Sequence, residues 1–450
     1  MPRLAGENPL VTDDEKQTMG IWMTSALVVG TIIGAGIFML PVSLAPLGAN
    51  ALIGWLVSGL GVMCIVFALA QLSRLGGDGI QANIEREFGP TVAFLVAWSF
   101  WFSNWVAAAS VAIGGASALS FVGLASPSTV VPLAIACVAV LTAVNAIGVR
   151  AAGGLSIVTV AIKVLPLLGV IWVFGERGAS GAAFEPLAPM PISFANIATA
   201  TALTFFALTG FESATAPVGK VRDAGRTIPR ALLGGTLFVL VLYLLAGTSI
   251  QMLLPADVVV NSSAPFADAL VSRWGHGVAS FAALTIAISA FGCLNGLILA
   301  SGELGYSMAL RGDLPAIVTR TRGADTPVVS QVLVAVLITL LLLANSSRSM
   351  ANLYTFIILL STAGIIVLYF VSALAAWKAN SSTGARWIVV GAVLFSAFAA
   401  YGTGLEACLW GIALLAVGLI IRAAMRRFNS NAETNLPAVL NPVVPPESSS

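Results

Sequence analysis

The chain has 450 residues, of which 58% are hydrophobic and 9% charged, with a mean hydropathy of +0.98 and a formal net charge of +2. An average soluble protein is about 25% charged, so this composition excludes a soluble enzyme of ordinary type. Apolar runs of roughly 17 to 25 residues are long enough to cross a bilayer. The sequence contains twelve, at 20–46, 51–73, 91–121, 129–148, 155–175, 193–219, 230–254, 276–305, 328–345, 350–376, 386–403 and 405–424. We therefore predict an all-α integral membrane protein with twelve transmembrane helices.

Basic residues set the predicted orientation, because cytoplasmic loops retain Lys and Arg. With the N-terminus inside, nearly all of the 21 basic residues fall in cytoplasmic loops or tails. The exceptions are Arg177, Arg273 and Arg348, which fall outside, and Lys163, which falls within a span. One miscounted span would invert every later loop. We therefore predict a multi-pass protein of the cell (inner) membrane with both termini cytoplasmic.

The first span contains an unusual concentration of glycine. In "VVGTIIGAGIF", Gly30, Gly34 and Gly36 lie in the middle of the apolar run, where each glycine costs about 1 kcal/mol of helix stability relative to alanine. The sixth span is interrupted at "TGFES", residues 209–213. The two interruptions lie five spans apart and in opposite predicted orientation. Glycine-interrupted segments at corresponding places in two halves of a hydrophobic chain indicate an inverted-repeat transporter with its site at the broken helices.

Close helix packing is the alternative explanation for these glycines. Gly30 and Gly34 have the G-x-x-x-G spacing that lets membrane helices approach one another. The matching interruption in the sixth span, beside a carboxylate, favours a binding site instead. Unwound backbone at membrane depth is tolerated only where it lines a cavity or is buried in protein.

Two charged residues lie deep in predicted spans, Lys163 in the fifth and Glu212 in the sixth. A charge at the middle of the membrane costs at least about 2.5 kcal/mol, so such residues usually face the bundle interior or a watered cavity. Both are candidate proton- or ion-coupling residues. The alternatives are a lysine whose stem reaches the cytoplasmic interface and a glutamate that caps the second half of the sixth span.

Backbone groups at the two interruptions suit an α-amino acid. A half-helix that begins after Gly36 directs free N–H groups and a positive dipole end toward a carboxylate. Half-helices that end near Ile33 and near Thr209 present free carbonyls to an ammonium. Side chains on neighbouring faces would then select the substrate, and the candidates are Phe100, Trp101, Phe206 and Leu297.

Three segments also carry a resemblance to a known family. "GTIIGAGIFMLP", "FFALTGFESATAPVGKVRDAGRTIPRAL" and "CLNGLILASGELGYSMALRGDLPAIVTRTRGADTPVVS" resemble the first, sixth and eighth helices of the amino acid-polyamine-organocation superfamily, the latter two with the loops that follow. The resemblance covers residues 19–376 and is closest to bacterial antiporters of the arginine/agmatine type. It implies a LeuT-type fold, a five-plus-five inverted repeat with discontinuous helices 1 and 6, followed by two extra helices.

The resemblance also implies roles for individual residues. Carboxylate-binding backbone falls at Ala35 and Gly36, ammonium-binding carbonyls at Ile32, Phe206 and Thr209 beside Gly210, and the buried glutamate at Glu212. In the arginine/agmatine antiporter an aromatic at the Phe206 position stacks on the substrate. Phe100 stands where a gate tyrosine is expected and Leu297 where a tryptophan is expected, which favours a small or apolar amino acid over arginine or agmatine. Lys163 resembles a helix-5 lysine that replaces Na⁺ in some relatives, which predicts sodium-independent transport.

We therefore predict a secondary active transporter that moves amino acids by alternating access, through exchange or proton coupling and without sodium. Its predicted segments are a cytoplasmic start at 1–18, the transporter core at 19–376, two additional spans at 377–427 and a disordered tail at 428–450. Expected partners are a small amino acid or amine and the lipid bilayer, with a homodimer left open and no nucleic acid or cofactor.

Three alternative functions differ from this prediction in the residues that they require. A polyamine or amine permease should need further acidic residues in the cavity, where only Glu212 is obvious. A membrane enzyme would need a nucleophile, a metal site or an acid–base cluster at membrane depth, and His276 and the scattered cysteines make none. A non-transporting sensor on the same fold stays open.

Overall fold

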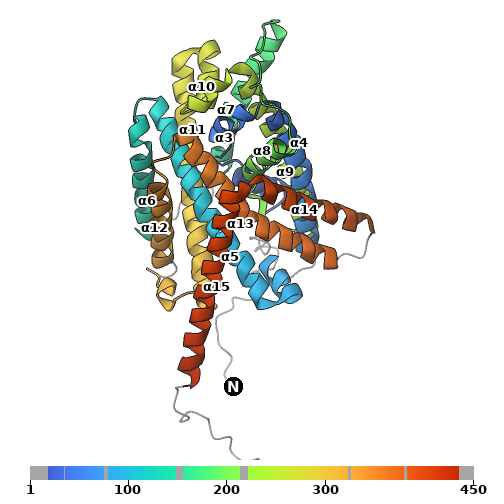
Figure 1. Cartoon of the computed structure of the whole chain (residues 1–450), viewed down its shortest axis with the longest axis vertical. Coiled ribbons are helices and arrows are strands. Elements are labelled where there is room, and N and C mark those ends of the chain that lie inside the picture. Colours follow the sequence, from blue (N-terminus) through green and yellow to red (C-terminus); the bar gives the residue numbers. More distant parts are fainter. Residues whose placement is uncertain are drawn as a thin grey trace, which may run out of the picture.

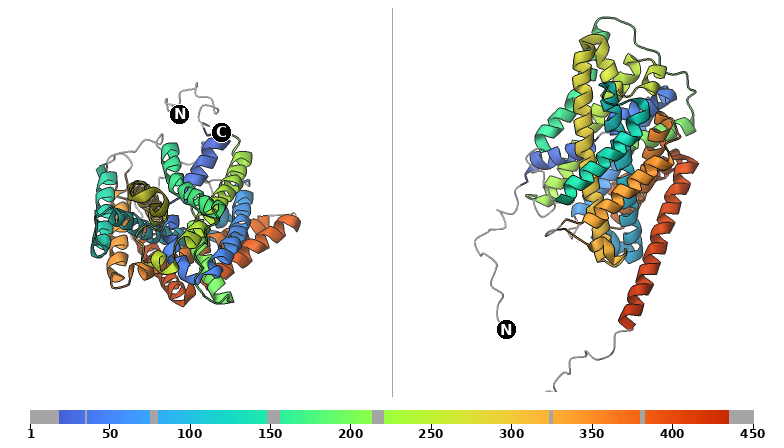
Figure 2. Two further views of the ribbon diagram at one scale, coloured as in Figure 1. Left: turned by 90° about the horizontal axis from the view of Figure 1, so that it is seen from above. Right: turned by 90° about the vertical axis from the view of Figure 1, so that its left-hand side faces the viewer.

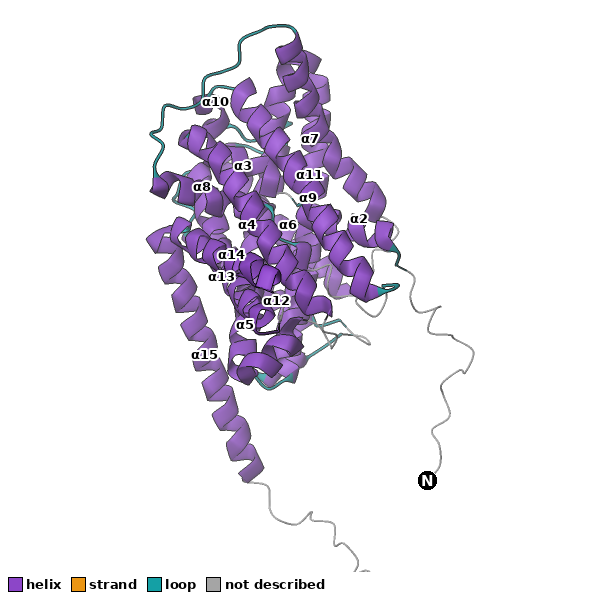
Figure 3. Cartoon of the chain, turned by 90° about the vertical axis from the view of Figure 1, so that its right-hand side faces the viewer, coloured by secondary structure: helices purple, strands orange, loops and turns teal. Residues whose placement is uncertain are grey.

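The computed structural model describes residues 19–34, 36–74, 80–147, 156–212, 221–322, 326–379 and 383–434. These ranges form helices joined by turns and loops, which include an extended loop at 180–193 between two helices (Figure 3). Within them, β-structure is limited to two isolated bridges, Met19 with Val221 and Arg322 with Thr326. The predicted all-helical class is therefore confirmed. The predicted start segment at 1–18, Ala35, the second half of the sixth span at 213–219 and the tail after 434 lie outside the described residues.

The helices follow the order of the apolar runs. They are α2 (Ile21–Ile32), α3 (Gly36–Leu44), α4 (Ala49–Arg74), α5 (Ile80–Phe121), α6 (Val130–Ile147), α7 (Ser156–Ala179), α8 (Phe194–Ala207), α9 (Ala224–Leu253), α10 (Ala256–Asn261), α11 (Pro265–Leu310), α12 (Val328–Ala344), α13 (Met350–Ala379), α14 (Thr383–Gly402) and α15 (Gly404–Thr434). Among the described helices, seven are each long and apolar enough to cross a membrane: α4, α5, α9, α11, α13, α14 and α15. The bent pair α2 and α3 makes an eighth candidate, and α6, α8 and α12 are shorter apolar helices.

Two of the longest helices change direction at a glycine. α5 kinks at Gly89, with φ 81°, and α11 kinks at Gly275, with φ 75°. This region of backbone space favours glycine, and Pro90 after the first kink also lacks a backbone donor. Each kink separates a short arm from a long apolar helix. The apolar helices begin where the sequence predicts the third and eighth spans, at 91 and 276.

α5 and α11 pack along each other in the middle of the bundle, with α13 against α5 and α6 beside α12 at one edge (Figure 1). On the other side α4 packs against α8 and α9. Small residues allow a close approach of α4 to α8: a Cβ on Gly54 of α4 would lie 2.7 Å from the Cβ of Ala200 on α8. This is the close backbone contact that glycine permits between membrane helices.

The last two helices lie at the periphery. α15 runs as a long rod along one side of the bundle and projects beyond it (Figure 2), with only 17% of its most apolar window buried. A buried ion pair attaches α15 to the bundle twelve residues before its end: Arg422 Nε donates to Asp313 Oδ1 at 2.8 Å and Arg422 Nη2 to the Pro90 carbonyl at 2.9 Å. The helix continues to Thr434, beyond the predicted span end at 424, because the sequence offers no glycine or proline before Pro437.

Candidate functional site

The first break separates α2 from α3. α2 ends at Ile32, and Ile33 leaves the helical region with ψ 80° while its N–H still bonds the Val29 carbonyl. The Gly34 N–H folds back onto the Ile32 carbonyl at 2.7 Å, and α3 begins at Gly36 with its axis turned by 43°. The unwinding therefore falls at the glycines, as predicted. Ala35, predicted to bind a carboxylate, lies outside the described residues.

The second break follows α8. This helix ends at Ala207, the chain reaches φ +114° at Gly210, and Phe211 and Glu212 form a short turn. Thr209 donates both its N–H, at 3.2 Å, and its hydroxyl, at 2.7 Å, to the Phe206 carbonyl. Gly210 is required here because other residues rarely adopt such a positive φ.

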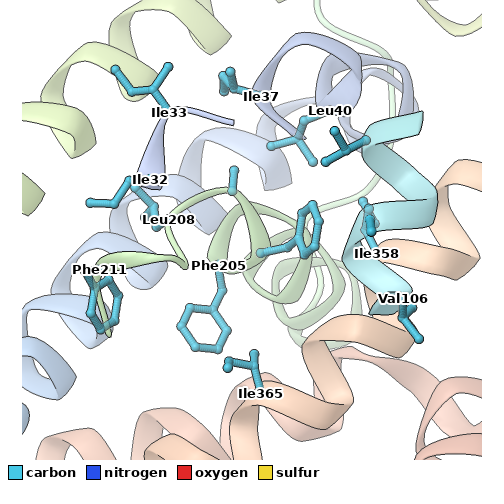
Figure 4. Packing of buried hydrophobic residues seen from close by; sticks show 14 of the residues in the cluster. Ile32, Ile33, Ile37, Leu40, Val106, Phe205, Leu208, Phe211, Ile358 and Ile365 are labelled. Atoms are coloured by element: carbon cyan, nitrogen blue, oxygen red, sulfur yellow. The ribbon is translucent and has the colours of Figure 1, made fainter. Parts of the chain in front are cut away.

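The two breaks lie against each other. A Cβ on Gly210 would be 2.6 Å from the Thr31 carbonyl oxygen, so only a glycine lets this backbone meet α2. A Cβ on Gly36 would be 3.0 Å from the Phe206 ring. Figure 4 shows Ile32, the last residue of α2, and Leu208, the residue that follows α8, next to each other in the buried cluster. One compact region therefore contains the helix ends of both breaks.

Three buried tyrosines donate to groups at the breaks. Tyr243 of α9 donates to the Ile32 carbonyl at 3.2 Å, and Tyr354 of α13 donates to the Gly36 carbonyl at 2.7 Å. Tyr369, also on α13, donates to Glu212 Oε2 at 2.5 Å. All three are fully buried. The sequence reasoning missed them, although a signal existed: the chain has only five tyrosines, and these three interrupt apolar runs where a hydroxyl needs a partner.

Glu212 and Lys163 both reach the breaks. Glu212 Oε2 accepts the Gly210 N–H at 3.1 Å as well as the Tyr369 hydroxyl, so the carboxylate caps the unwound segment. Lys163 of α7 is half-buried, and its Nζ donates to the Gly30 carbonyl at 3.3 Å. That carbonyl belongs to the last turn of α2, which lacks helical partners and carries the negative dipole end.

Comparison with known proteins identifies the family of the chain. A sequence model of the family described as "Amino acid permease" matches residues 19–421. The chain belongs to the amino acid permease family. It is accordingly a multi-pass membrane transport protein of the amino acid-polyamine-organocation superfamily, and members of this family are permeases rather than enzymes.

The permease has relatives along most of its length. It is 27% identical over 417 residues to the putrescine transporter PotE of Haemophilus influenzae, which covers 89% of this chain and 95% of that protein. It is 27% identical over 459 residues to a putative arginine/ornithine antiporter of Bacillus subtilis, covering 91% and 97%. It is 28% identical over 352 residues to the cadaverine/lysine antiporter of Escherichia coli, covering 74% and 77%.

The remaining predicted site residues of the permease lie on α5 and α11. Trp101 is buried between these helices, where its indole N–H donates to the Ser301 carbonyl at 2.9 Å and its ring lies 5.0 Å from that of Trp98. This contact gives Trp101 a packing role, and its place in the site stays a prediction. Phe100 is partly buried beside the core.

α11 reaches the first break through Cys293, whose Sγ would be 3.1 Å from a Cβ on Gly34. Leu297 lies four residues further on, so it shares that helix face. Its assignment to the site also stays a prediction. Cys293 itself was missed from the sequence, because nothing in the spacing of the four cysteines distinguishes it from a core residue.

Replacing Lys163 tests its role in the permease. We expect Lys163→Met to lower the exchange rate about tenfold, because it removes the cation that stabilises the carbonyl end of α2. Lys163→Arg keeps the charge and should retain more of the rate. The measurement is the initial rate in proteoliposomes from pH 5 to pH 8. Wild-type rates for Lys163→Met over that range would assign the lysine to the membrane interface instead.

Proposed function

We propose that this permease exchanges amino acids across the cytoplasmic membrane by alternating access, without sodium. The observation that carries the proposal is the contact between the two breaks, where Gly36 lies against Phe206 and Gly210 against Thr31. Backbone of this kind at membrane depth must bind something or be covered by protein. An α-amino acid carries the two opposite charges that the two kinds of helix end prefer.

The carboxylate would bind at the start of α3. The first N–H groups of a helix have no partner within it and lie at the positive end of its dipole. Ile37 and Phe38 are in this first turn, and both are buried. An anion there would gain hydrogen bonds in a region of low dielectric, where they are strong.

The ammonium would bind at the carbonyl ends of α2 and α8. In the structure two of the three predicted acceptors already hold two donors each: the Ile32 carbonyl has Gly34 and Tyr243, and the Phe206 carbonyl has both groups of Thr209. A carbonyl oxygen has two lone pairs. Substrate binding would therefore displace one of these local bonds, which couples occupancy of the site to the shape of the unwound segments.

Sodium independence rests on Lys163. Its ammonium contacts the Gly30 carbonyl at the end of α2, and a fixed cation there would do what a bound Na⁺ does for a free helix terminus. The exchange proposed here then needs no inorganic cation. Proton coupling through Lys163 or Glu212 is the second form that this proposal allows.

The substrate proposed is a small or apolar amino acid. Phe206 covers Gly36, and Leu297 shares the α11 face that meets Gly34, so the predicted lining is apolar. Glu212 is engaged with Gly210 and Tyr369 rather than left for a second ammonium of the substrate. The relatives favour a second candidate, a cationic amino acid or a polyamine, because their names include putrescine, ornithine, lysine and cadaverine.

The proposal includes a topology. Each of the twelve apolar runs overlaps a helix or, in the first and sixth, a helix that ends at a break. We infer twelve spans with both termini cytoplasmic, a core at 19–376 built as a LeuT-type inverted repeat, and two additional spans after it. The pairing of the broken first and sixth spans supports this arrangement. A non-transporting sensor on the same fold is the remaining alternative.

An exchange screen tests the function. The purified permease is reconstituted in liposomes loaded with mixed amino acids, and uptake of each labelled amino acid, agmatine and putrescine is measured with and without Na⁺. We expect stimulated exchange of a subset of amino acids that is unchanged by Na⁺. Exchange of amines alone would replace this proposal with a polyamine permease. Folded protein that exchanges none of the tested compounds would favour a non-transporting sensor.

A further inference from the structure

The start of α13 is joined to α3 at both ends of that short helix. Tyr354 donates to the carbonyl of Gly36, the first residue of α3, at 2.7 Å. Its neighbour Thr355 shares a hydrogen bond of 2.6 Å with Ser43, near the other end of α3. Gly36 and Ser43 are seven residues apart, or about 10 Å along a helix. Two adjacent residues of α13 thus fix α3 at two separate points.

The two hydrogen bonds act on different parts of α3. The Gly36 carbonyl and the Ile37 N–H belong to one peptide unit, which is planar, so fixing the oxygen fixes the direction of that N–H. The Ile37 N–H is one of the first donors of α3. Ser43 lies at the opposite end of the helix, and its bond leaves that donor untouched.

Gly36 is held from two sides. The Phe206 ring lies against its α-carbon, where a Cβ would be 3.0 Å away, and the Tyr354 hydroxyl holds its carbonyl. Glycine is the most conformationally permissive residue, so these two contacts restrict the backbone where it has the most freedom. A hydrogen bond accepted by the carbonyl also polarises the peptide and strengthens its N–H as a donor. The first turn of α3 is thereby pre-oriented toward an anion.

The hydroxyl of Tyr354 is needed for this contact, and its ring is not sufficient. Tyr354 is fully buried, and phenylalanine would fill the same space without bringing a polar atom to membrane depth. A buried hydroxyl without a partner would destabilise the fold, so its place is justified by the bond that it makes.

We propose that Tyr354 is a positioning residue that aims the Ile37 N–H at the substrate carboxylate and so favours amino acids over the amines that lack a carboxylate. This inference rests on the proposed function and adds to it the group that selects for the carboxylate. Tyr354 acts through Gly36, so its effect depends on whether the substrate has an anion to be bound.

Paired inhibitors measure this selectivity. Exchange by the wild type, Tyr354→Phe and the matched control Thr355→Val is inhibited with ornithine or putrescine, lysine or cadaverine, and leucine or isoamylamine. We expect Tyr354→Phe to raise the inhibition constants of the amino acids about fivefold, the usual effect of losing one hydrogen bond, and to change those of the amines less than twofold. Thr355→Val should leave the ratio within each pair unchanged.

Each result has one meaning. An equal rise for amino acids and amines in Tyr354→Phe would show that the residue only holds the fold, and this would overturn the inference. A change of selectivity in Thr355→Val as large as in Tyr354→Phe would also overturn it, because the Gly36 contact would then be irrelevant. Wild-type protein that exchanges none of the compounds would reject the proposed function itself, and the inference with it. Monodisperse elution and an unchanged melting temperature exclude unfolding in either variant.

Discussion

Gly36→Leu is expected to abolish exchange while the protein still inserts and folds. A Cβ at this position would already lie 3.0 Å from the Phe206 ring, and the rest of a leucine side chain would fill the space between α3 and α8. The N–H groups at the start of α3 would be covered at the same time. We expect at least about a hundredfold loss of rate, because the blocked contact is the one that transport would use. Initial exchange in proteoliposomes measures it.

Gly234→Leu is the matched control for this change. Gly234 lies on the exposed face of α9, where a Cβ would meet nothing within 4 Å, so Gly234→Leu makes the same substitution within a predicted span but away from the breaks. We expect wild-type rates. Normal exchange by Gly36→Leu would show that the first break is not part of the binding site.

Gly210→Ala is expected to cause the second largest loss. The new Cβ would lie 2.6 Å from the Thr31 carbonyl oxygen, and the alanine would have to keep the φ of +114° that Gly210 adopts. Strain of this kind costs on the order of 1 to 3 kcal/mol, and relief of the contact would move the two breaks apart. We expect exchange to fall by at least about thirtyfold with a lower melting temperature.

Gly404→Ala distinguishes the two expected causes of the loss in Gly210→Ala, which are backbone strain and the contact with Thr31. Gly404 also has a positive φ, 79°, but a Cβ there would meet nothing within 4 Å. The Gly404→Ala variant therefore introduces the backbone strain without a contact between the two breaks. We expect a modest fall in melting temperature and normal exchange. Equal losses of exchange in both variants would mean that strain alone, and not the contact with Thr31, explains Gly210→Ala.

The positions of the breaks and kinks were predictable from the sequence. Glycine is costly inside a membrane helix, so the clusters around Gly36 and Gly210 mark places where the helix ends. The starts of the third and eighth spans, predicted at 91 and 276 from the apolar runs, fall directly after the kinks at Gly89 and Gly275. Local backbone preference determines where the helices break and kink, and this preference depends on short stretches of sequence.

The partners of the breaks were not predictable in this way. Tyr354 and Gly36 are 318 positions apart, and only the packing of α13 against α3 brings them together. The Ile32 carbonyl, expected to be free, likewise accepts a hydrogen bond from the distant Tyr243, whereas the Phe206 carbonyl accepts from its near neighbour Thr209. Trp101 donates to the Ser301 carbonyl, 200 positions away, and its predicted contact with the substrate stays a prediction. Periodicity identifies a helix face but not the atom that the face will meet.

The central claim is that substrate binds between the two breaks, and labelling of Cys293 tests it most directly. Cys293 lies against Gly34, and replacing Cys64, Cys137 and Cys408 with serine leaves it as the single thiol. The rate of its modification by a small thiol reagent is measured with and without a saturating exchanged amino acid. We predict that the amino acid slows labelling severalfold and that an amino acid that is not exchanged has no effect. Labelling that is unchanged by substrate, in a variant that still exchanges it, would contradict a site at the broken helices.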